Sequence, residues 1–463
     1  MDFKQLKRDI WEAIAGTDQD FTRVSMKRAV FLLSVPMVLE MMMESIFAVV
    51  DIWFVSRLGA EAVATVGITE SLTTIVYSIG GGLATATTAL VARRIGEHNP
   101  KEASRVAFQA IIAGILASFL ISVPGILWAP EILKLMGASE IIVNEHSIYT
   151  RIILGSNAII MLLFIINAVL RSSGDAAMSL RVMWVANIIN LILDPLLIFG
   201  IGPFPELGIK GAAIATATGR GIAVLFQFFI LFRGKRRIKL TVNEIGFNPK
   251  LILQIIRLAL GGIGQTLIAT TSWVGLIRIV AQFGSSVVAG YTIALRIIIF
   301  ALLPSWGISN AAATLVGQNL GAGEPERAER AVWITGWINS LLLLSIGAIL
   351  VIFPGSFIRV FMDGEDIVAP GIEALRIISL GFVFYGLGMV LVQAFNGAGD
   401  TFTPTWINLL CFWIIEIPLA YLLAIHLKLE QSGVFMSIPI AESLMTVFAL
   451  ILFRRGKWKQ KIV

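Results

Sequence analysis

The sequence predicts an all-α membrane protein whose twelve transmembrane helices form two similar halves. The 463 residues are 57% hydrophobic and only 14% charged, whereas soluble domains carry about 25% charged residues. The apolar residues form runs of about 20 or more, the length of a membrane-spanning helix. Membrane barrels are instead built of alternating segments of about 10 residues. Finally, several motifs recur at one constant offset along the chain.

Twelve apolar runs follow one another with short loops between them. We expect transmembrane helices at 29–56, 66–92, 103–127, 148–170, 177–201, 209–232, 251–280, 287–316, 331–353, 371–395, 403–426 and 433–453. Most of the 36 Lys and Arg residues lie in the segments on the same side of the membrane as the N-terminus. This positive-inside bias predicts a protein of the cytoplasmic membrane with both termini in the cytoplasm. It also accounts for the net charge of +6 without a nucleic-acid partner.

An internal repeat relates the two halves at an offset of 225 residues. The segment ALVARRIGEHNPKEASR (89–105) aligns with TLVGQNLGAGEPERAER (314–330), and RSSGDAAMS (171–179) aligns with NGAGDTFTP (396–404). Because six spans return the chain to the side on which it began, the halves are parallel repeats, an arrangement typical of transporters that rock two lobes. A duplicated structural bundle without transport is the alternative.

The repeat and the spans define the expected domain organisation. An N-terminal lobe (29–233) and a C-terminal lobe (251–454) are joined by a basic cytoplasmic linker (234–250), and a basic cytoplasmic tail follows at 455–463. In the N-terminal segment, 1–28, five apolar residues share one helical face: Phe3, Leu6, Ile10, Trp11 and Ile14. Both an interfacial helix on the inner leaflet and a solvated tail are consistent with that pattern.

Two aspartates lie inside apolar spans, Asp51 in the first and Asp194 in the fifth. A carboxylate inside a membrane costs several kcal/mol, so such residues mark functional sites. Both are expected about 9–12 Å below the outer end of their helices and can therefore meet at one level. At the repeat offset they align with Leu276 and Leu419, so the acidic pair belongs to the N-terminal half alone. Bonding of each aspartate to nearby backbone groups is the structural alternative.

Further polar residues share a helix face with these aspartates. The helix period places Glu40 and Glu44 on the face of the first aspartate, and Asn187 and Asn190 beside the second. Carboxylate and amide oxygens suit either a proton relay or a hard cation such as sodium. The residues therefore predict a cation-coupling site and leave the choice between H⁺ and Na⁺ open.

Other residues are expected to line a wet cleft or to allow movement. The two glutamates of the first span are assigned to the cleft, and Glu416 and Glu442 in the last two spans are expected to contact substrate. Met41 belongs to a methionine-rich stretch whose flexible thioethers suit ligands of several shapes, although packing against lipid is the commoner use. Pro36 predicts either a hinge or a static kink in the first span.

Several chemistries have no support in the sequence. The chain has no G-x-x-x-x-G-K-[ST] loop for ATP, and three histidines with one cysteine make no convincing zinc site. The single Cys411 also excludes an internal disulfide. Gly397–Asp400 matches the G-x-G-D string of intramembrane aspartyl proteases, but Ser173–Asp175 is its counterpart in the other half, as expected of a turn. We therefore predict neither an enzyme nor a cofactor.

These residues resemble the multidrug and toxic compound extrusion (MATE) family, in particular its DNA-damage-inducible branch. The resemblance runs over essentially the whole chain. It rests on Pro36, Asp51 and the segments IGEHNPKEA (95–103), LRSSGD (170–175), FNGAGDTFTP (395–404), NIINLILDPLLIFG (187–200) and LGIKGAAIATATG (207–219). The two Gly-Asp loops together with the Asn-x-x-x-Asp-Pro span are fairly specific.

The resemblance implies a V-shaped pair of six-helix lobes around a central cleft, in a protein expected to be a monomer among membrane lipids. It also implies alternating-access export of small amphipathic, often cationic, compounds, driven by inward flow of H⁺ or Na⁺. In this branch the coupling site lies in the N-terminal lobe, which carries over to Asp51, Asn190 and Asp194. Sodium, if it is the coupling ion, would bind there. Thr216 would add an oxygen, and Tyr149 is a weaker candidate for the same cavity.

The sequence departs from the family pattern at two positions assigned to the cleft. Gln265 stands in span 7, where other branches keep a glutamate, and Phe47 stands where a tyrosine is frequent. The major facilitator fold also has six-plus-six repeats, but its G-x-x-x-D-R-x-G-R string is absent here. A lipid-linked oligosaccharide flippase of the same superfamily stays an alternative because four arginines fall within or near spans: Arg220, Arg257, Arg278 and Arg296.

Overall fold

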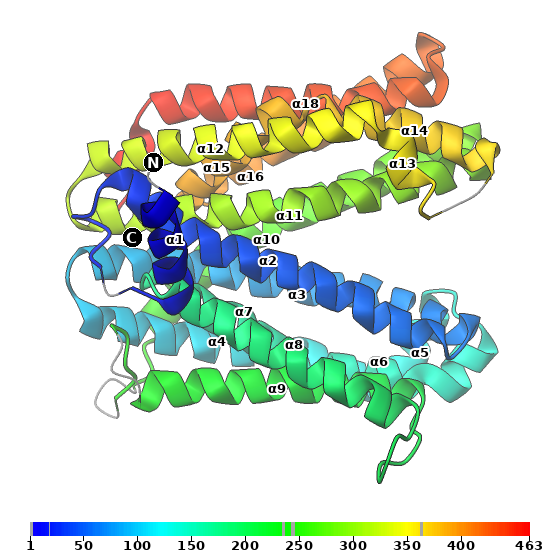
Figure 1. The fold of residues 1–463 in the computed structure, drawn as a ribbon, viewed down its shortest axis with the longest axis horizontal. Coiled ribbons are helices and arrows are strands. Elements are labelled where there is room, and N and C mark those ends of the chain that lie inside the picture. Colours follow the sequence, from blue (N-terminus) through cyan, green and yellow to red (C-terminus); the bar gives the residue numbers. More distant parts are fainter. Residues whose placement is uncertain (1–2, 18, 234–236, 242–245, 362–363) are drawn as a thin grey trace. The chain divides into compact units, whose positions relative to one another are not determined.

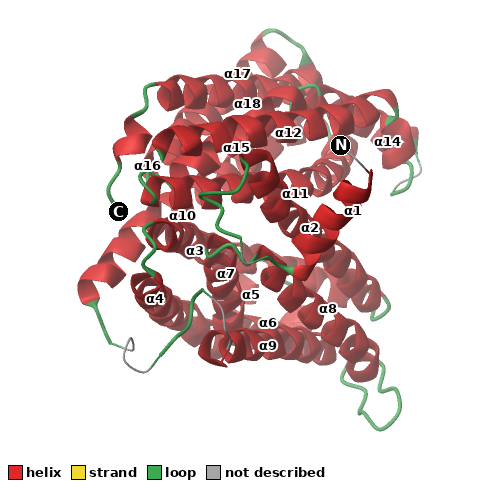
Figure 2. Cartoon of the chain, turned by 60° about the vertical axis from the view of Figure 1, so that its left-hand side comes forward, coloured by secondary structure: helices red, strands yellow, loops and turns green. Residues whose placement is uncertain are grey.

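The computed structural model describes residues 3–17, 19–233, 237–241, 246–361 and 364–463. In these ranges the chain consists of helices joined by loops, without a β-strand (Figures 1 and 2). The predicted all-α fold is therefore confirmed. Parts of the predicted linker, 234–236 and 242–245, lie outside the described residues.

The α-helices follow one another along the chain, with short π- and 3₁₀-segments between some of them. They are α1 (Phe3–Ala15), α2 (Met26–Ser56), α3 (Ala60–Gly96), α4 (Pro100–Leu127), α5 (Ala129–Leu135), η1 (Ile142–His146), α6 (Ser147–Gly155), α7 (Asn157–Ser172), α8 (Ala176–Ile198), α9 (Ile209–Arg233), α10 (Pro249–Val280), η3 (Ala281–Phe283), α11 (Ser285–Gly321), α12 (Pro325–Ile352), α13 (Pro354–Ile358), α14 (Glu365–Ser379), α15 (Phe382–Gly397), α16 (Phe402–Asn408), η4 (Leu409–Glu416), α17 (Ile417–Tyr421), η5 (Leu422–His426), α18 (Glu430–Arg454) and η6 (Lys457–Gln460).

Among the described residues, eleven helical segments are long and apolar enough to cross a membrane, and a bent pair of helices supplies a twelfth span. This count confirms the prediction of twelve spans. The tenth predicted span, 371–395, differs from expectation because it is broken into α14 and α15, which meet at an angle of 57°. At the break, the amides of Leu380 and Gly381 bond carbonyls three residues back, which tightens the end of α14.

Large apolar side chains lie exposed along these helices. Leu120, Trp337 and Leu225 are 78%, 75% and 69% exposed. Extensive exposed apolar surface marks contact with a membrane or with another protein. Together with the spans it identifies a multi-pass membrane protein.

The chain divides into two compact units. Unit 1 comprises Met1–Asp18 and Leu39–Ile263, and unit 2 comprises Gln19–Val38 and Gly264–Val463. The unit boundaries within α2 and α10 fall at residues 39 and 264, which are related by the repeat offset of 225. The first part of α2 therefore belongs to unit 2, and the first part of α10 belongs to unit 1.

Both units contain the same three-helix arrangement. Helices α3, α4 and α7 pack against one another in unit 1, and α11, α12 and α15 do so in unit 2. Each helix of the first set begins and ends 225 residues before its counterpart, as in Ala60–Gly96 and Ser285–Gly321. The predicted duplication is therefore present in the described structure.

The paired Gly-Asp loops form the same helix-ending turn in both units. Gly174 and Gly399 adopt positive φ angles of 92° and 83°. The amide of Asp175 donates to the Leu170 carbonyl at 2.9 Å, and the amide of Asp400 donates to the Phe395 carbonyl at the same distance. A hydrogen bond from an amide to the carbonyl five residues earlier, next to a glycine in the left-handed conformation, is a Schellman motif. The motif accounts for the G-x-G-D string without a proteolytic role.

The Schellman turns lead to a stability prediction. We expect Gly174→Ala to lower the free energy of unfolding by about 1–2 kcal/mol, because a Cβ is disfavoured at positive φ. The measurement is thermal unfolding of the purified protein in detergent. Gly81→Ala is the matched control, since Gly81 lies within α3 and a Cβ there would meet no atom within 4 Å. Equal melting temperatures for Gly174→Ala and the control would contradict the prediction.

Candidate functional site

Two glycines allow α8 and α9 to pack backbone to backbone in unit 1. A Cβ on Gly219 would lie 2.8 Å from the Ala186 carbonyl oxygen, and one on Gly211 would collide with the Leu197 carbonyl. The two helices lie side by side (Figure 1, green). Small residues at such crossings are typical of membrane helix pairs. The close packing brings Asn190 of α8 to Thr216, which precedes Gly219 by about one turn of α9.

Four of the predicted coupling residues meet at this crossing. The Asn190 amide donates to Asp194 Oδ1 and to Thr216 Oγ1, at 3.3 Å in each case. Asp51, on α2, interacts with Thr216 and lies close enough to Asp194 for the two carboxylates to repel each other. Asp194 is fully buried, and Asp51 is half-buried.

The two aspartates retain unused acceptor atoms. Asp51 Oδ1 and Asp194 Oδ2 are buried, and neither has a hydrogen-bond partner within the described ranges. An unpaired buried carboxylate is costly, so a proton or a cation would stabilise the pair. No cluster of three or more His, Cys, Asp or Glu among the described residues could hold a metal. The two carboxylates, amide and hydroxyl are the oxygen groups that suit H⁺ or Na⁺.

Arg220 of α9 provides a positive charge next to this cluster. Its Nη2 lies 3.6 Å from Glu44 Oε1, and its Nη1 donates to the Tyr77 hydroxyl at 3.4 Å. It also interacts electrostatically with Asp51, and its guanidinium lies 5.4 Å from the centre of the Phe47 ring. Glu44 and Phe47, which were assigned to the cleft, therefore both contact Arg220. The sequence by itself links Arg220 only to the flippase alternative.

Two further aromatic and acidic residues belong to the same electrostatic network. Tyr149 of α6 is buried and interacts with Asp51, and also with Glu70 and Tyr77 of α3. Glu70 interacts with Asp51 as well. Glu70 is not among the site residues predicted from the sequence, although a charged residue inside the predicted span 66–92 is a usable signal.

Three other predicted residues of α2 and α8 lie outside the Asp51–Asp194 contacts. Asn187 is buried and donates to the Met43 carbonyl at 3.4 Å, which ties α8 to α2. The Met41 carbonyl accepts a bond from Ser45, and its side chain is half-buried. Pro36 lies inside α2 without ending it. A role of Pro36 as a hinge stays a prediction.

Glu40 and Gln265 each bond protein groups at matching positions of the repeat. Arg171 Nη1 donates to the buried Glu40 Oε1 at 2.8 Å, and Asn167 donates to the same oxygen at 3.3 Å. Glu40 aligns with Gln265, and Arg171 aligns with Asn396. In unit 2 the Gln265 and Asn396 amides exchange two hydrogen bonds of 3.0 and 3.1 Å. The same helix-to-helix connection is thus an ion pair in one unit and a neutral amide pair in the other.

The predicted substrate residue Glu416 lies in unit 2. It is buried and close to Glu442, so the two carboxylates interact electrostatically. They form a second acidic pair, separate from the Asp51–Asp194 cluster.

The chain matches known transporters over nearly its whole length. The MatE family model matches residues 36–196 and 263–422, one stretch in each half. The "Probable multidrug resistance protein YoeA" of Bacillus subtilis is 24% identical over 453 residues, with 96% of each chain covered. The "FAD transporter" of Shewanella oneidensis is 27% identical over 437 residues, which cover 92% of this chain and 94% of the relative.

Solved structures share the fold. A MOP superfamily transporter from Pyrococcus furiosus, whose title reports reverse polarity of the binding pocket, is 25% identical with a TM-score of 0.89. The match covers 96% of this chain and 98% of that chain. The structural match therefore covers both halves of the chain, as the family model and the relatives do in sequence.

The Glu40–Arg171 ion pair leads to a prediction about stability. Arg171→Asn leaves a buried carboxylate unpaired and should lower the free energy of unfolding by about 3–5 kcal/mol. The double variant Glu40→Gln/Arg171→Asn copies the neutral pair of unit 2 and should recover most of that loss. Thermal unfolding in detergent measures both effects. A double variant no more stable than Arg171→Asn would show that the two connections are not interchangeable.

Proposed function

Because this chain belongs to the MatE family, whose members are transporters and not enzymes, we propose that it is a cation-coupled exporter. It exchanges small amphipathic, often cationic, organic compounds for H⁺ or Na⁺ that enters the cell. We place the coupling site at Asp51, Asn190, Asp194 and Thr216 in unit 1. The protein is proposed to act as a monomer in the cytoplasmic membrane, with both termini in the cytoplasm.

The observation that carries this proposal is the pair of adjacent aspartates with unused buried oxygens. Asp51 and Asp194 repel each other, and each has one buried oxygen atom without a hydrogen-bond partner among the described residues. Among the described residues, Arg220 is the basic side chain that interacts with Asp51, and no basic side chain interacts with Asp194. One arginine cannot neutralise both carboxylates. Binding of H⁺ or Na⁺ would remove the excess charge.

The proposed cycle couples this neutralisation to alternating access. With the site open to the outside, Asp51 and Asp194 take up the cation, which favours release of the exported compound. Opening toward the inside then discharges the cation. Arg220 interacts with both Asp51 and Glu44, so loss of charge on Asp51 strengthens its pairing with Glu44. Arg220 thereby transmits the state of the aspartates to neighbouring positions on α2.

A lipid-linked oligosaccharide flippase is the alternative function. Such a protein would need arginines free to bind pyrophosphate. Arg220 is instead held by Glu44, Tyr77 and Asp51, which favours the exporter. The relatives named a multidrug resistance protein and an FAD transporter differ in substrate, so the compound exported here is left open within the proposal.

Removal of either acid tests the coupling role. We expect Asp51→Asn and Asp194→Asn each to reduce drug efflux from cells by more than about tenfold, because an amide binds neither H⁺ nor Na⁺ as a carboxylate does. Size-exclusion profiles and expression should match the unmodified protein. Glu61→Gln, at the exposed start of α3, is the control and should export normally. Normal efflux by either aspartate variant would refute the coupling role.

Imposed gradients distinguish exporter from flippase and H⁺ from Na⁺. Proteoliposomes loaded with a fluorescent organic cation are given a pH gradient, a sodium gradient, both or neither. We expect transport with at least one gradient and none when both are absent, because uphill export requires coupling. Transport without any gradient, together with lipid-linked sugar movement, would favour the flippase. The gradient that supports transport identifies the coupling ion.

A further inference from the structure

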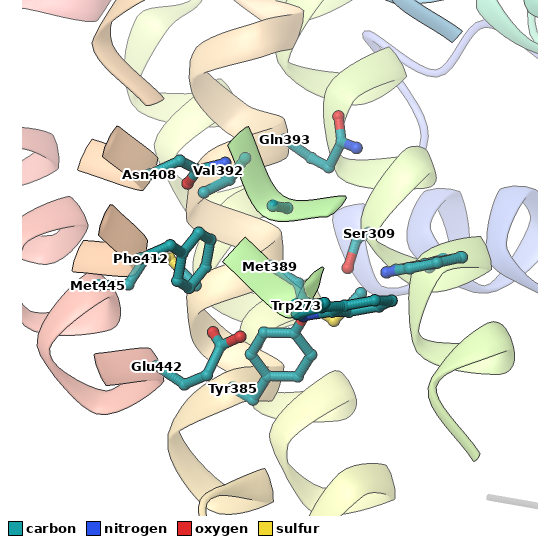
Figure 3. A pocket seen from close by; sticks show the side chains of 12 residues that line it. Trp273, Ser309, Tyr385, Met389, Val392, Gln393, Asn408, Phe412, Glu442 and Met445 are labelled. Atoms are coloured by element: carbon teal, nitrogen blue, oxygen red, sulfur yellow. The ribbon is translucent and has the colours of Figure 1, made fainter. Parts of the chain in front are cut away.

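Unit 2 contains a pocket inside its helix bundle that the proposed coupling site does not use. The pocket has a volume of about 140 Å³ and is lined by residues of α10, α11, α15, α16, η4 and α18. Figure 3 shows Glu442, Tyr385 and Phe412 around one side of it, with Asn408 and Val392 above them. The space is large enough for a small organic group and is bounded by helices of one unit.

The pocket carries an acid without a matching cation. Glu442 lines it, and the Oε2 atom of Glu442 is buried without a hydrogen-bond partner in the described structure. Glu416 is 2% exposed, also has an unpartnered Oε2 atom, and interacts electrostatically with Glu442. Within the described ranges, neither glutamate forms an ion pair with a lysine or arginine. Unit 2 therefore holds uncompensated acidic groups next to an open space.

A second feature of the pocket is an amide on its wall. Asn408 is 8% exposed and lines the pocket. A side-chain amide can donate to or accept from a polar group of a ligand.

The remaining walls are aromatic and sulfur-containing. Trp273, Trp306, Tyr385 and Phe412 present ring surfaces, and Met389 and Met445 add thioethers. Aromatic faces attract organic cations, and thioethers adapt to ligands of different shapes. A bare proton or a sodium ion would need only oxygen ligands and would gain nothing from these walls.

The repeat shows which positions of unit 1 correspond to this acid pair. Glu416 aligns with Leu191 and Glu442 aligns with Ala217, each one residue after the bonded Asn190 and Thr216 of unit 1. Glu416 ends a π-helical segment, η4, and π-segments frequently occur at functional sites because they change the direction of side chains. The contact between the fifth and sixth helices is therefore polar in both units, but its chemistry differs.

We propose that this pocket is a binding site for an aromatic monovalent organic cation, with Glu442 as the counter-charge and Asn408 as a polar contact. The inference rests on the proposed export function, since such a cation is the exported compound. Glu416 acts as a positioning residue that adds negative potential behind Glu442. Cation recognition thus lies in unit 2, whereas ion coupling lies in unit 1.

Equilibrium binding to the purified full-length protein tests this site without any ion gradient. The probe is radiolabelled benzyltrimethylammonium in equilibrium dialysis, and benzenesulfonate is the anionic counterpart of similar size. We expect Glu442→Gln to raise the dissociation constant for the cation at least about tenfold, because it removes the counter-charge. Glu430→Gln, an exposed glutamate at the start of the same helix, is the matched control and should bind normally.

A second variant addresses the case in which Glu442→Gln fails to fold. Val392 lines the pocket, so Val392→Trp should fill it and abolish binding without a change of charge. Unchanged cation affinity in Glu442→Gln or in Val392→Trp would overturn the proposal, and so would equal binding of benzenesulfonate. Asp51→Asn changes no residue of the pocket, so it should lose gradient-driven efflux while binding of the cation is still detected in this assay. Failure of the coupling site and failure of the pocket therefore give different results.

Discussion

Two carboxylates in a dry environment cannot both stay charged unless something positive neutralises them. Asp51 and Asp194 are placed under that constraint by the close packing of α8 and α9, which Gly211 and Gly219 permit. Asn190 donates to Asp194 and Thr216 at once and so uses both protons of its amide. The remaining buried oxygens need a proton or a cation, and the polar network around Arg220 is arranged about that need.

Duplication has produced one framework with two chemistries. Helices of identical length pack in the same pattern in both units, and both Gly-Asp turns have the same hydrogen bonds. Within that framework, an ion pair between Glu40 and Arg171 corresponds to a neutral pair between Gln265 and Asn396. Aligned positions can thus carry a neutral pair in one unit and a charged pair in the other, because the helix packing is the same with either pair.

The structure brings Asp51 and Asp194 together, as their depth in the sequence predicts, whereas the partner of Glu40 does not follow from the sequence. Asp51 and Asp194 were expected to meet because their depth follows from residue spacing along two straight apolar helices. Glu40 was expected to face a wet cleft, but it bonds Arg171, which lies 131 residues further along the chain. Helix periodicity specifies a face and not the partner opposite that face. For the same reason the sequence alone does not connect Arg220 with Glu44 and does not place Glu70 in the network.

The sequence by itself determined the helical fold, the twelve spans and the duplication, because hydrophobic length and repeat offset are properties of the linear chain. It also determined that two aspartates, Asp51 and Asp194, lie inside spans of the first half. Only the tertiary structure decided which polar groups neutralise one another, since that depends on helix crossings set by packing between distant segments. The bend between α14 and α15 and the aromatic pocket around Glu442 likewise arise from such long-range packing.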